Sequence, residues 1–221
     1  MQRAQVIATL AVAVARAASS ATRPLRVGID GADGAGKTTT RLALAVELRL
    51  RGAHVIEASL DDFHHPRVHR YRQGRDSWRG YTDDAFDLAR VRRDLLDPLG
   101  PGGDRRFRAK AHDLATDREL DEPWAHATPG AILLLDGVML QRPELADALD
   151  LVIYLDASEA ERCRRLAERD GADPDPEAPA NVRYTLAHRH YQAFCRPRER
   201  AHLVVGTEDL AAPTILRGSP S

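Results

Sequence analysis

Short apolar runs alternate with longer segments of helical periodicity along this chain. The apolar runs predict buried strands, which we place at residues 25–30, 53–58, 131–135, 151–155 and 203–205. The segments between and around them predict helices, at residues 6–18, 37–50, 84–96, 158–170 and 181–196. Strands that alternate with helices favour an α/β fold, in which a parallel β-sheet is flanked by helices on both faces. Within 37–50, the positions with helical spacing are Leu42, Val46 and Leu50.

The segment between residues 59 and 83 interrupts this pattern. It is polar and rich in His and Arg, which indicates a substrate loop or insert rather than core. Around it we expect a helical arm at 1–22, one α/β domain at 23–210 and a flexible tail at 211–221. Residues 105–128 are ambiguous between a loop and a short hairpin.

The charge balance argues against two classes of partner. Lys plus Arg total 32 and Asp plus Glu total 33, so the net charge is −1, without the positive surplus that nucleic-acid or membrane binding requires. The apolar run near the N-terminus is too short to cross a bilayer and is a poor signal peptide. Cys163 and Cys195 form no CxxC pair, which fits a reducing compartment. We therefore expect a cytoplasmic protein with no nucleic-acid or membrane partner.

One motif identifies a phosphate-binding loop. Residues 31–38 read Gly-Ala-Asp-Gly-Ala-Gly-Lys-Thr, which matches G-x-x-x-x-G-K-[ST] in full between a predicted strand and a predicted helix. Backbone N–H groups and the helix N-terminus can hold phosphates there, Lys37 can neutralise the β and γ oxygens, and Thr38 can ligate magnesium. We predict a P-loop NTPase fold, with Lys37 in a catalytic role. ATP would be bound by Gly31, Ala32, Asp33, Gly34, Ala35, Gly36, Lys37, Thr38 and Thr39.

An acidic residue ends the predicted strand at 131–135. Asp136 would hold Mg²⁺ together with Thr38, directly or through water. Capping of the turn before Gly137 is the structural alternative. The chain has no Asn-Lys-x-Asp guanine-recognition motif, so a GTPase switch protein is the weaker hypothesis.

Two more carboxylates, Asp61 and Asp62, directly follow the second predicted strand. Ligands of parallel sheets lie beyond the carboxyl ends of the strands, so these side chains are expected to face the phosphate site. One of them could accept the proton of an attacking hydroxyl and aim it at the γ-phosphate. Capping and solvation are the alternative for such a pair.

From about residue 26 to residue 205, the chain resembles the uridine kinase family, within the group that includes phosphoribulokinase and bacterial pantothenate kinase. The resemblance rests on the P-loop, Ser59 to Phe63, Asp84-Ala85-Phe86-Asp87, Asp136-Gly137-Val138, Leu151 to Asp156, and an Arg-rich helix ending in Arg169-Asp170. It implies that Asp61 is the catalytic base, with Asp62 beside it, and that Asp84 binds the acceptor ribose. N-capping of the next helix is the alternative for Asp84. We assign His64 to the acceptor from its chain position alone.

The same resemblance implies a small lid at about 158–180, with arginines over the phosphates. Arg165 is expected to bind ATP and Arg169 to act in catalysis. The alternative is a solvated helix face whose arginines pair with nearby acidic residues. Leu166 stands where the family carries a second tandem Arg, and the family's further Arg-Gly-Arg is absent.

The base-recognition segment of the family is only partly present. Phe107 and His112 keep its outer positions and are expected to stack on and hydrogen-bond a flat ring, whereas Ala109 replaces the middle aromatic residue. Otherwise Phe107 belongs to the core and His112 to the surface. The Arg-rich insert at 67–79, which includes Tyr71, has no clear counterpart, and we expect it to tune the acceptor pocket.

Three functions remain open at this point. The leading hypothesis is transfer of the γ-phosphoryl group of ATP to a nucleoside 5′-hydroxyl, with uridine or cytidine as first choice. A kinase for another small alcohol, such as a vitamin or sugar phosphate, is the main rival because the base segment and lid depart from the family. A regulatory ATPase without an acceptor is the third. Family members are often oligomeric, so a homo-oligomer is also open.

Overall fold

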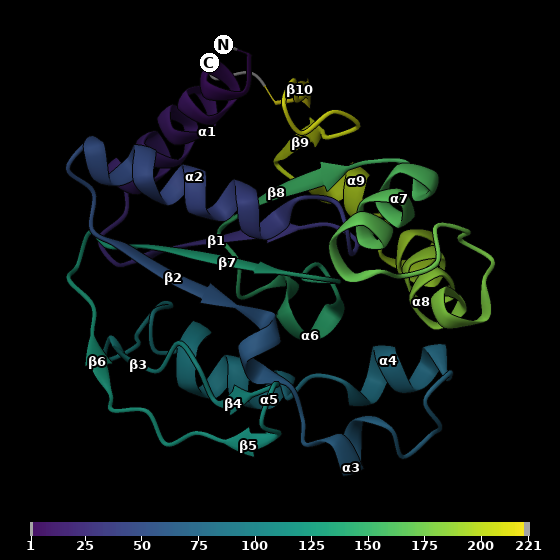
Figure 1. The fold of residues 1–221 in the computed structure, drawn as a ribbon. Coiled ribbons are helices and arrows are strands. Elements are labelled where there is room, and N and C mark those ends of the chain that lie inside the picture. Colours follow the sequence, from purple (N-terminus) through teal and green to yellow (C-terminus); the bar gives the residue numbers. More distant parts are fainter. Residues whose placement is uncertain (1, 219–221) are drawn as a thin grey trace.

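A six-stranded sheet lies at the centre of the computed structural model, which describes residues 2–218 (Figure 1). The strand order is β10-β9-β8-β1-β7-β2, and every neighbouring pair is parallel except β9 with β10. The bounds are β1 Leu25–Asp30, β2 Val55–Ser59, β7 Ile132–Gly137, β8 Leu151–Asp156, β9 Leu203–Gly206 and β10 Thr214–Arg217. The α/β class predicted from the apolar runs is confirmed, and the sheet is parallel as predicted except at its edge strand β10.

Helices cover both faces of this sheet because alternate strand residues point to opposite sides. Ile132 and Leu134 of β7 pack with α1 and α2, whereas Leu133 and Leu135 belong to the core on the other face. The helices are α1 Gln2–Ser19, α2 Lys37–Leu50, α3 Arg67–Arg70, α4 Trp78–Asp84, α5 Leu88–Val91, α6 Pro143–Ala146, α7 Glu159–Asp170, α8 Pro179–Cys195 and α9 Pro197–Arg200. Within residues 2–218, no helix is both long enough and apolar enough to cross a bilayer.

The helix predicted at 84–96 is wrong in its start and its continuity. Asp84 ends α4, α5 begins after Asp87, and residues Arg92–Leu96 form a π-helical turn. The backbone around Ala85 leaves the helical path to bond the strand-end turn: the N–H of His65 donates to Ala85 O at 2.9 Å, and the N–H of Asp87 donates to Phe63 O at 2.8 Å. Asp87, whose side chain accepts from the Arg90 N–H, is therefore the helix cap, and the capping alternative for Asp84 is wrong.

The chain after residue 210 also differs from the expectation of a loose tail. Thr214–Arg217 forms β10, which pairs with the free edge of β9. Ile215 packs against the cluster formed by α1, α2 and the sheet, so an apolar side chain anchors the added strand. Residues 219–221 of the predicted tail lie outside the described residues.

Helix α2 is confirmed from Lys37 to Leu50. The residues that it turns toward the core are not the Leu and Val residues whose spacing predicted the helix. Its buried residues are Thr40, Leu44, Ala45 and Leu48. Leu42, Val46 and Leu50 are 50%, 57% and 79% exposed. The two stripes lie on different sides of one helix, and only packing against α1 and the sheet selects between them.

Two short antiparallel pairs replace the ambiguous stretch 105–128. β3 Arg106–Phe107 pairs with β6 Ala125–His126, and β4 His112–Asp113 pairs with β5 Arg118–Glu119. These pairs lie below β2 in Figure 1, next to α5. The hairpin alternative for this stretch is confirmed.

Candidate phosphotransfer site

The P-loop between β1 and α2 has the backbone that its glycines make possible. Gly34 and Gly36 have φ angles of 78° and 92°, in the left-handed region that favours glycine. A Cβ at Gly34 would lie 2.6 Å from the carbonyl oxygen of Arg162 in α7. Helix α2 has no side-chain cap at its start, so its first N–H groups stay available for an anion.

We expect Gly34→Ala to lower the free energy of unfolding by about 2 kcal/mol, because it adds both left-handed strain and a clash with Arg162. For a chain of this size, that corresponds to a fall in Tm of about 4–8 °C. Gly74→Ala is the matched control, since Gly74 has φ 95° but nothing within 4 Å of an added Cβ. Both variants are measured by thermal denaturation. Equal losses of stability would show that the close approach of α7 to the P-loop adds nothing to the cost of a side chain at position 34.

Lys37 lies over the P-loop at the start of α2. Its ammonium donates to Ala32 O at 2.9 Å and lies 3.9 Å from the carboxylate of Asp33. Asp33 also accepts a hydrogen bond from the Tyr81 hydroxyl at 3.0 Å. The only cation inside the loop is thus held next to the positions where phosphate oxygens bind in this motif.

Asp136 ends β7 beside the P-loop. It is 2% exposed and accepts from the Thr38 hydroxyl at 2.8 Å and from Arg41 Nε at 2.8 Å. Arg41 is held in turn by Glu57 of β2 at 2.5 Å. A hydroxyl and a carboxylate side by side fit Mg²⁺, which binds few protein ligands and takes the rest from phosphate and water. Arg41, which sequence reasoning missed, supplies the positive charge beside Asp136 in this arrangement.

Asp61 lies two residues beyond β2, in the 3₁₀ turn Leu60–Phe63. Register places Ser59 of β2 next to Asp136, so the strand ends bring both carboxylates to one edge of the sheet. Asp61 remains open to the cleft, yet the surrounding protein atoms reduce its hydration. That desolvation, followed by the charge of Asp33, raises the pKa of Asp61 to about 6, against the opposing charge of Lys37.

Two neighbouring cavities meet at this carboxylate. The first, here called the P-loop cavity, has a volume of about 420 Å³ and contains Lys37, Thr38 and Asp136. The second, the insert cavity, has a volume of about 470 Å³ and lies between the turn after β2, the insert and α8. The residues that line both cavities are Asp33, Asp61, Leu166 and Arg169. A group in one cavity can therefore approach a group in the other at Asp61.

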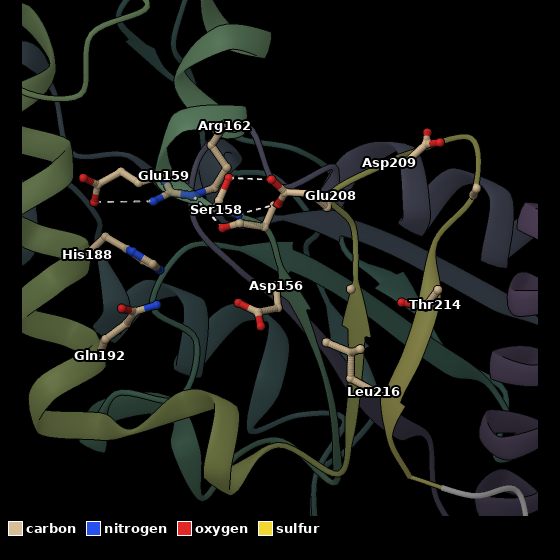
Figure 2. Close-up of a pocket in the computed structure, with 13 residues that line it drawn as sticks. Asp156, Ser158, Glu159, Arg162, His188, Gln192, Glu208, Asp209, Thr214 and Leu216 are labelled. Carbon is tan, nitrogen blue, oxygen red and sulfur yellow. Dashed lines mark hydrogen bonds and ion pairs between the residues drawn. The ribbon is translucent and has the colours of Figure 1, made fainter.

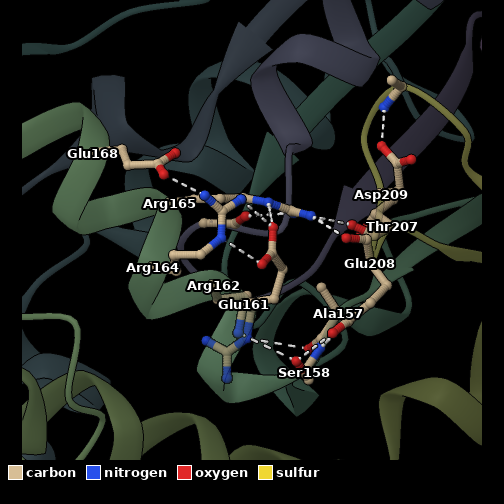
Figure 3. A network of polar contacts seen from close by, with 12 residues as sticks. Ala157, Ser158, Glu161, Arg162, Arg164, Arg165, Glu168, Thr207, Glu208 and Asp209 are labelled. Atoms are coloured by element: carbon tan, nitrogen blue, oxygen red, sulfur yellow. Dashed lines mark hydrogen bonds and ion pairs between the residues drawn. The ribbon is translucent and has the colours of Figure 1, made fainter.

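Helix α7 holds the P-loop through its arginines (Figure 3). Arg165 donates to Gly34 O at 3.2 Å and to Thr207 O, beyond β9, at 2.6 Å. Arg162 donates to Asp33 O at 3.4 Å. Arg164 instead pairs with Glu161 and Glu168, as the alternative of a solvated helix face predicts. The helix therefore divides its arginines between the loop and the solvent.

No protein-family model matches the chain. A uridine kinase from Lactobacillus johnsonii is 25% identical over 199 residues, covering 86% of this chain and 90% of that protein. A uridine kinase from Leuconostoc citreum is 27% identical over 209 residues, covering 88% and 93%. The structure of a possible uridine kinase from Bacillus stearothermophilus matches with a TM-score of 0.70 and 24% identity, covering 91% of this chain and 96% of that chain.

This chain is a distant relative of the uridine kinases and has the fold of the P-loop kinases. A D-glycerate 3-kinase from Cryptococcus neoformans shares the fold alone, with a TM-score of 0.57 and 13% identity over 96% of this chain and 98% of that one. Proteins with this fold are thus named for different acceptors.

The structure brings together only part of the predicted acceptor set. His64 lines the insert cavity, and its ring Nδ1 lies 2.8 Å from Asp61 O. Desolvation lowers the pKa of His64 to about 4, so the ring is neutral near pH 7. Asp62 pairs with Lys110 at 3.2 Å. Within residues 2–218, Asp62 lines neither cavity.

The remaining predicted acceptor residues lie in packed surroundings. Asp84 is fully buried and bound by Arg72 and by Gln73, the latter at 2.6 Å. Phe107 is 8% exposed in the core, as its structural alternative predicted. His112 is 1% exposed, so its placement at the surface is wrong. Among the residues described, none of these three lines either cavity.

Sequence reasoning missed much of the insert cavity wall. Its aromatic residues are Tyr71, Tyr81 and Tyr184, and its cations include Arg70 and Arg183. The sequence places Tyr71 only within an Arg-rich insert. Nothing in the local sequence predicts that residues 70–81 contact residues 180–184. Helices α4 and α8 make this connection, with the Tyr81 and Tyr184 rings 4.8 Å apart.

A third cavity lies on another side of α7 (Figure 2). It has a volume of about 610 Å³ and is lined by α7, α8 and the β9–β10 region, including Asp156, His188 and Glu208. Glu208 is bound by the Ser158 hydroxyl at 2.6 Å. Its described lining residues include none from the P-loop.

Proposed function

We propose that this kinase transfers the γ-phosphoryl group of ATP to a hydroxyl of a small molecule bound in the insert cavity. The observation that supports this most directly is the position of Asp61, in the shared wall between the P-loop cavity and the insert cavity. A hydrolase needs only the first cavity and water. The second cavity gives an acceptor a place from which its hydroxyl can reach the phosphate in line.

Each residue has a distinct role in this proposal. The P-loop N–H groups and Lys37 hold the phosphates, and Thr38 and Asp136 would hold Mg²⁺, which neutralises phosphate charge when bound. Asp61 accepts the proton of the acceptor hydroxyl, and its raised pKa makes it a better base than an ordinary aspartate. Arg169, in the shared wall, lies where it can stabilise the charge of the transferred group.

Two classes of acceptor follow from different observations. The curated relatives and the resemblance favour a nucleoside, with uridine or cytidine first and the 5′-hydroxyl as the site of transfer. The insert cavity favours a different small alcohol, because Asp84, Phe107 and His112 do not line it, whereas tyrosines and arginines do. The homo-oligomer stays a prediction.

The proposal is tested by coupled ADP release with ATP and Mg²⁺ across a panel of alcohols that includes uridine and cytidine. We expect at least one acceptor to raise ADP release well above the rate with water, and mass spectrometry to find the phosphorylated acceptor. Release that no acceptor changes, with inorganic phosphate as the product, would instead identify an ATPase.

A further inference from the structure

Two arginines line the insert cavity although each is almost fully buried. Arg70 of α3 is 8% exposed and Arg183 of α8 is 6% exposed. Burying a guanidinium is costly unless a counter-ion and hydrogen-bond acceptors compensate for lost water. The partners of these two side chains therefore indicate whether the cavity is complete without a ligand.

Arg183 has a carbonyl and three aromatic rings around it but no acid. Its Nη1 donates to Arg75 O, and its guanidinium lies 5.2, 5.2 and 5.4 Å from the ring centroids of Tyr71, Tyr81 and Tyr184. Nε is buried without a hydrogen-bond partner. Across residues 2–218, no carboxylate lies within ion-pair distance of Arg183. The rings hold the group in place but leave its charge without a counter-ion.

Arg70 is only partly compensated. Its Nη2 lies 3.5 Å from Asp117, and its Nη1 is buried without a partner. Its guanidinium also lies 5.4 Å from the Tyr71 ring centroid, so Arg70 and Arg183 meet at the same ring. Arg67 and Arg75 lie 5.9 and 5.3 Å from that ring as well. This end of the cavity therefore concentrates positive charge.

The carboxylates that line the insert cavity are committed elsewhere. Asp33 and Asp61 belong to the wall shared with the P-loop cavity, and Asp170 is bound by Arg169 at 2.6 Å. The cavity wall thus contains a base, Asp61, together with one guanidinium group without a counter-ion, that of Arg183, and a second that is only partly compensated, that of Arg70. A neutral alcohol would leave Arg183 buried without a counter-ion and Arg70 with Asp117 alone.

We propose that the acceptor is a small alcohol that carries an anionic group, a carboxylate or a phosphate, which Arg70 and Arg183 bind while its hydroxyl lies at Asp61. This rests on the function proposed above and specifies the acceptor. In the transfer, the acceptor oxygen forms a bond to the γ-phosphorus, the bond to the β–γ bridging oxygen breaks, the hydroxyl proton passes to Asp61, and ADP leaves. Guanidinium groups bind both anions by paired N–H donors.

Binding is tested first with simple anions. The protein, with its P-loop cavity filled by Mg²⁺ and a non-hydrolysable ATP analogue, is titrated calorimetrically with inorganic phosphate and with glycolate. We expect at least one of the two to bind, and Arg70→Met and Arg183→Lys to weaken that binding about tenfold or more, because each loses donors to the anion. Arg79→Met is the matched control, since Arg79 is an exposed residue of the same insert and does not line the cavity.

Turnover then separates the two anion sources. Matched pairs differ only in the anionic group: pantothenate against pantothenol, D-glycerate against glycerol, and D-ribose 5-phosphate against D-ribose. We expect phosphorylation of the anionic member of at least one pair but not of its neutral partner. The KM for that anionic acceptor should be higher in Arg70→Met than in the wild type. Near-ultraviolet circular dichroism verifies that each variant is folded. At position 183 the substitution is Lys because it keeps the positive charge and so favours a folded protein.

Distinct outcomes overturn the inference and the function. Efficient phosphorylation of uridine or another neutral alcohol, unchanged in Arg70→Met, would refute the anionic acceptor and leave the kinase proposal standing. Failure of both anions to bind, or equal binding in all variants, would also refute it. ATP hydrolysis that no alcohol changes, with anion binding that still depends on Arg70 and Arg183, would refute the kinase proposal alone.

Discussion

Replacing Asp61 with Asn is expected to lower the rate of phosphoryl transfer by about 10²-fold or more while ATP binding is kept. The amide has nearly the same shape but cannot accept a proton from the acceptor hydroxyl. Asp61 lies in the wall between the two cavities. The phosphate contacts expected of the P-loop come from other residues. Single-turnover transfer and equilibrium binding of a fluorescent ATP analogue measure the two quantities separately.

The neighbouring carboxylate provides the control for this experiment. Asp62 has the same charge and sequence context but pairs with Lys110. Asp62→Asn should therefore keep most of the activity. If Asp61→Asn and Asp62→Asn behave alike, the carboxylate is not the base. If Asp61→Asn leaves ATP turnover intact without any acceptor product, the regulatory ATPase is the better account.

The raised pKa of Asp61 adds a pH signature to the same prediction. Only the ionised carboxylate accepts a proton, so wild-type kcat/KM should rise with pH through about 6 and level off above it. The acid limb should disappear from the residual activity of Asp61→Asn. A wild-type profile that stays flat well below pH 6, in protein that remains folded, would contradict a base at this position.

Lys37→Ala is expected to weaken ATP binding and transfer together, with a loss in kcat/KM of about 10²–10³-fold. Lys37 is the cation at the start of α2, and its ammonium lies 2.9 Å from a P-loop carbonyl oxygen, from where it can turn to the phosphates. Removing it leaves the charge of the β and γ oxygens without its closest partner. Calorimetry with the ATP analogue and coupled ADP release measure the two losses.

Lys110→Ala is the matched control because the chain contains only these two lysines. Lys110 lies 3.2 Å from Asp62, and neither residue of that pair lines the P-loop cavity in the part of the chain described here. We expect its variant to bind ATP like the wild type. Normal ATP affinity in folded Lys37→Ala would mean that the loop binds phosphate by its backbone alone.

The sheet was predictable because its signals are local. Continuous apolar runs such as 131–135 arise from strands covered on both faces, and the P-loop pattern encodes its own backbone through glycine and the following helix. The break between α4 and α5 was not predictable. It depends on backbone hydrogen bonds that join Asp87 to Phe63 and Ala85 to His65, at and just after the turn that follows β2 and much earlier in the chain.

By itself, the sequence determined the α/β sheet, the phosphate loop and the placement of Asp61 and Asp136 at strand ends, because parallel strands bring their carboxyl ends to one edge. Only the tertiary structure decided the acceptor cavity. Most of its cations and aromatic rings come from α3 and the residue after it, α4, α7 and α8. A side chain such as Arg183 is buried without a counter-ion only when these helices pack. Local spacing carries no record of such long-range contacts.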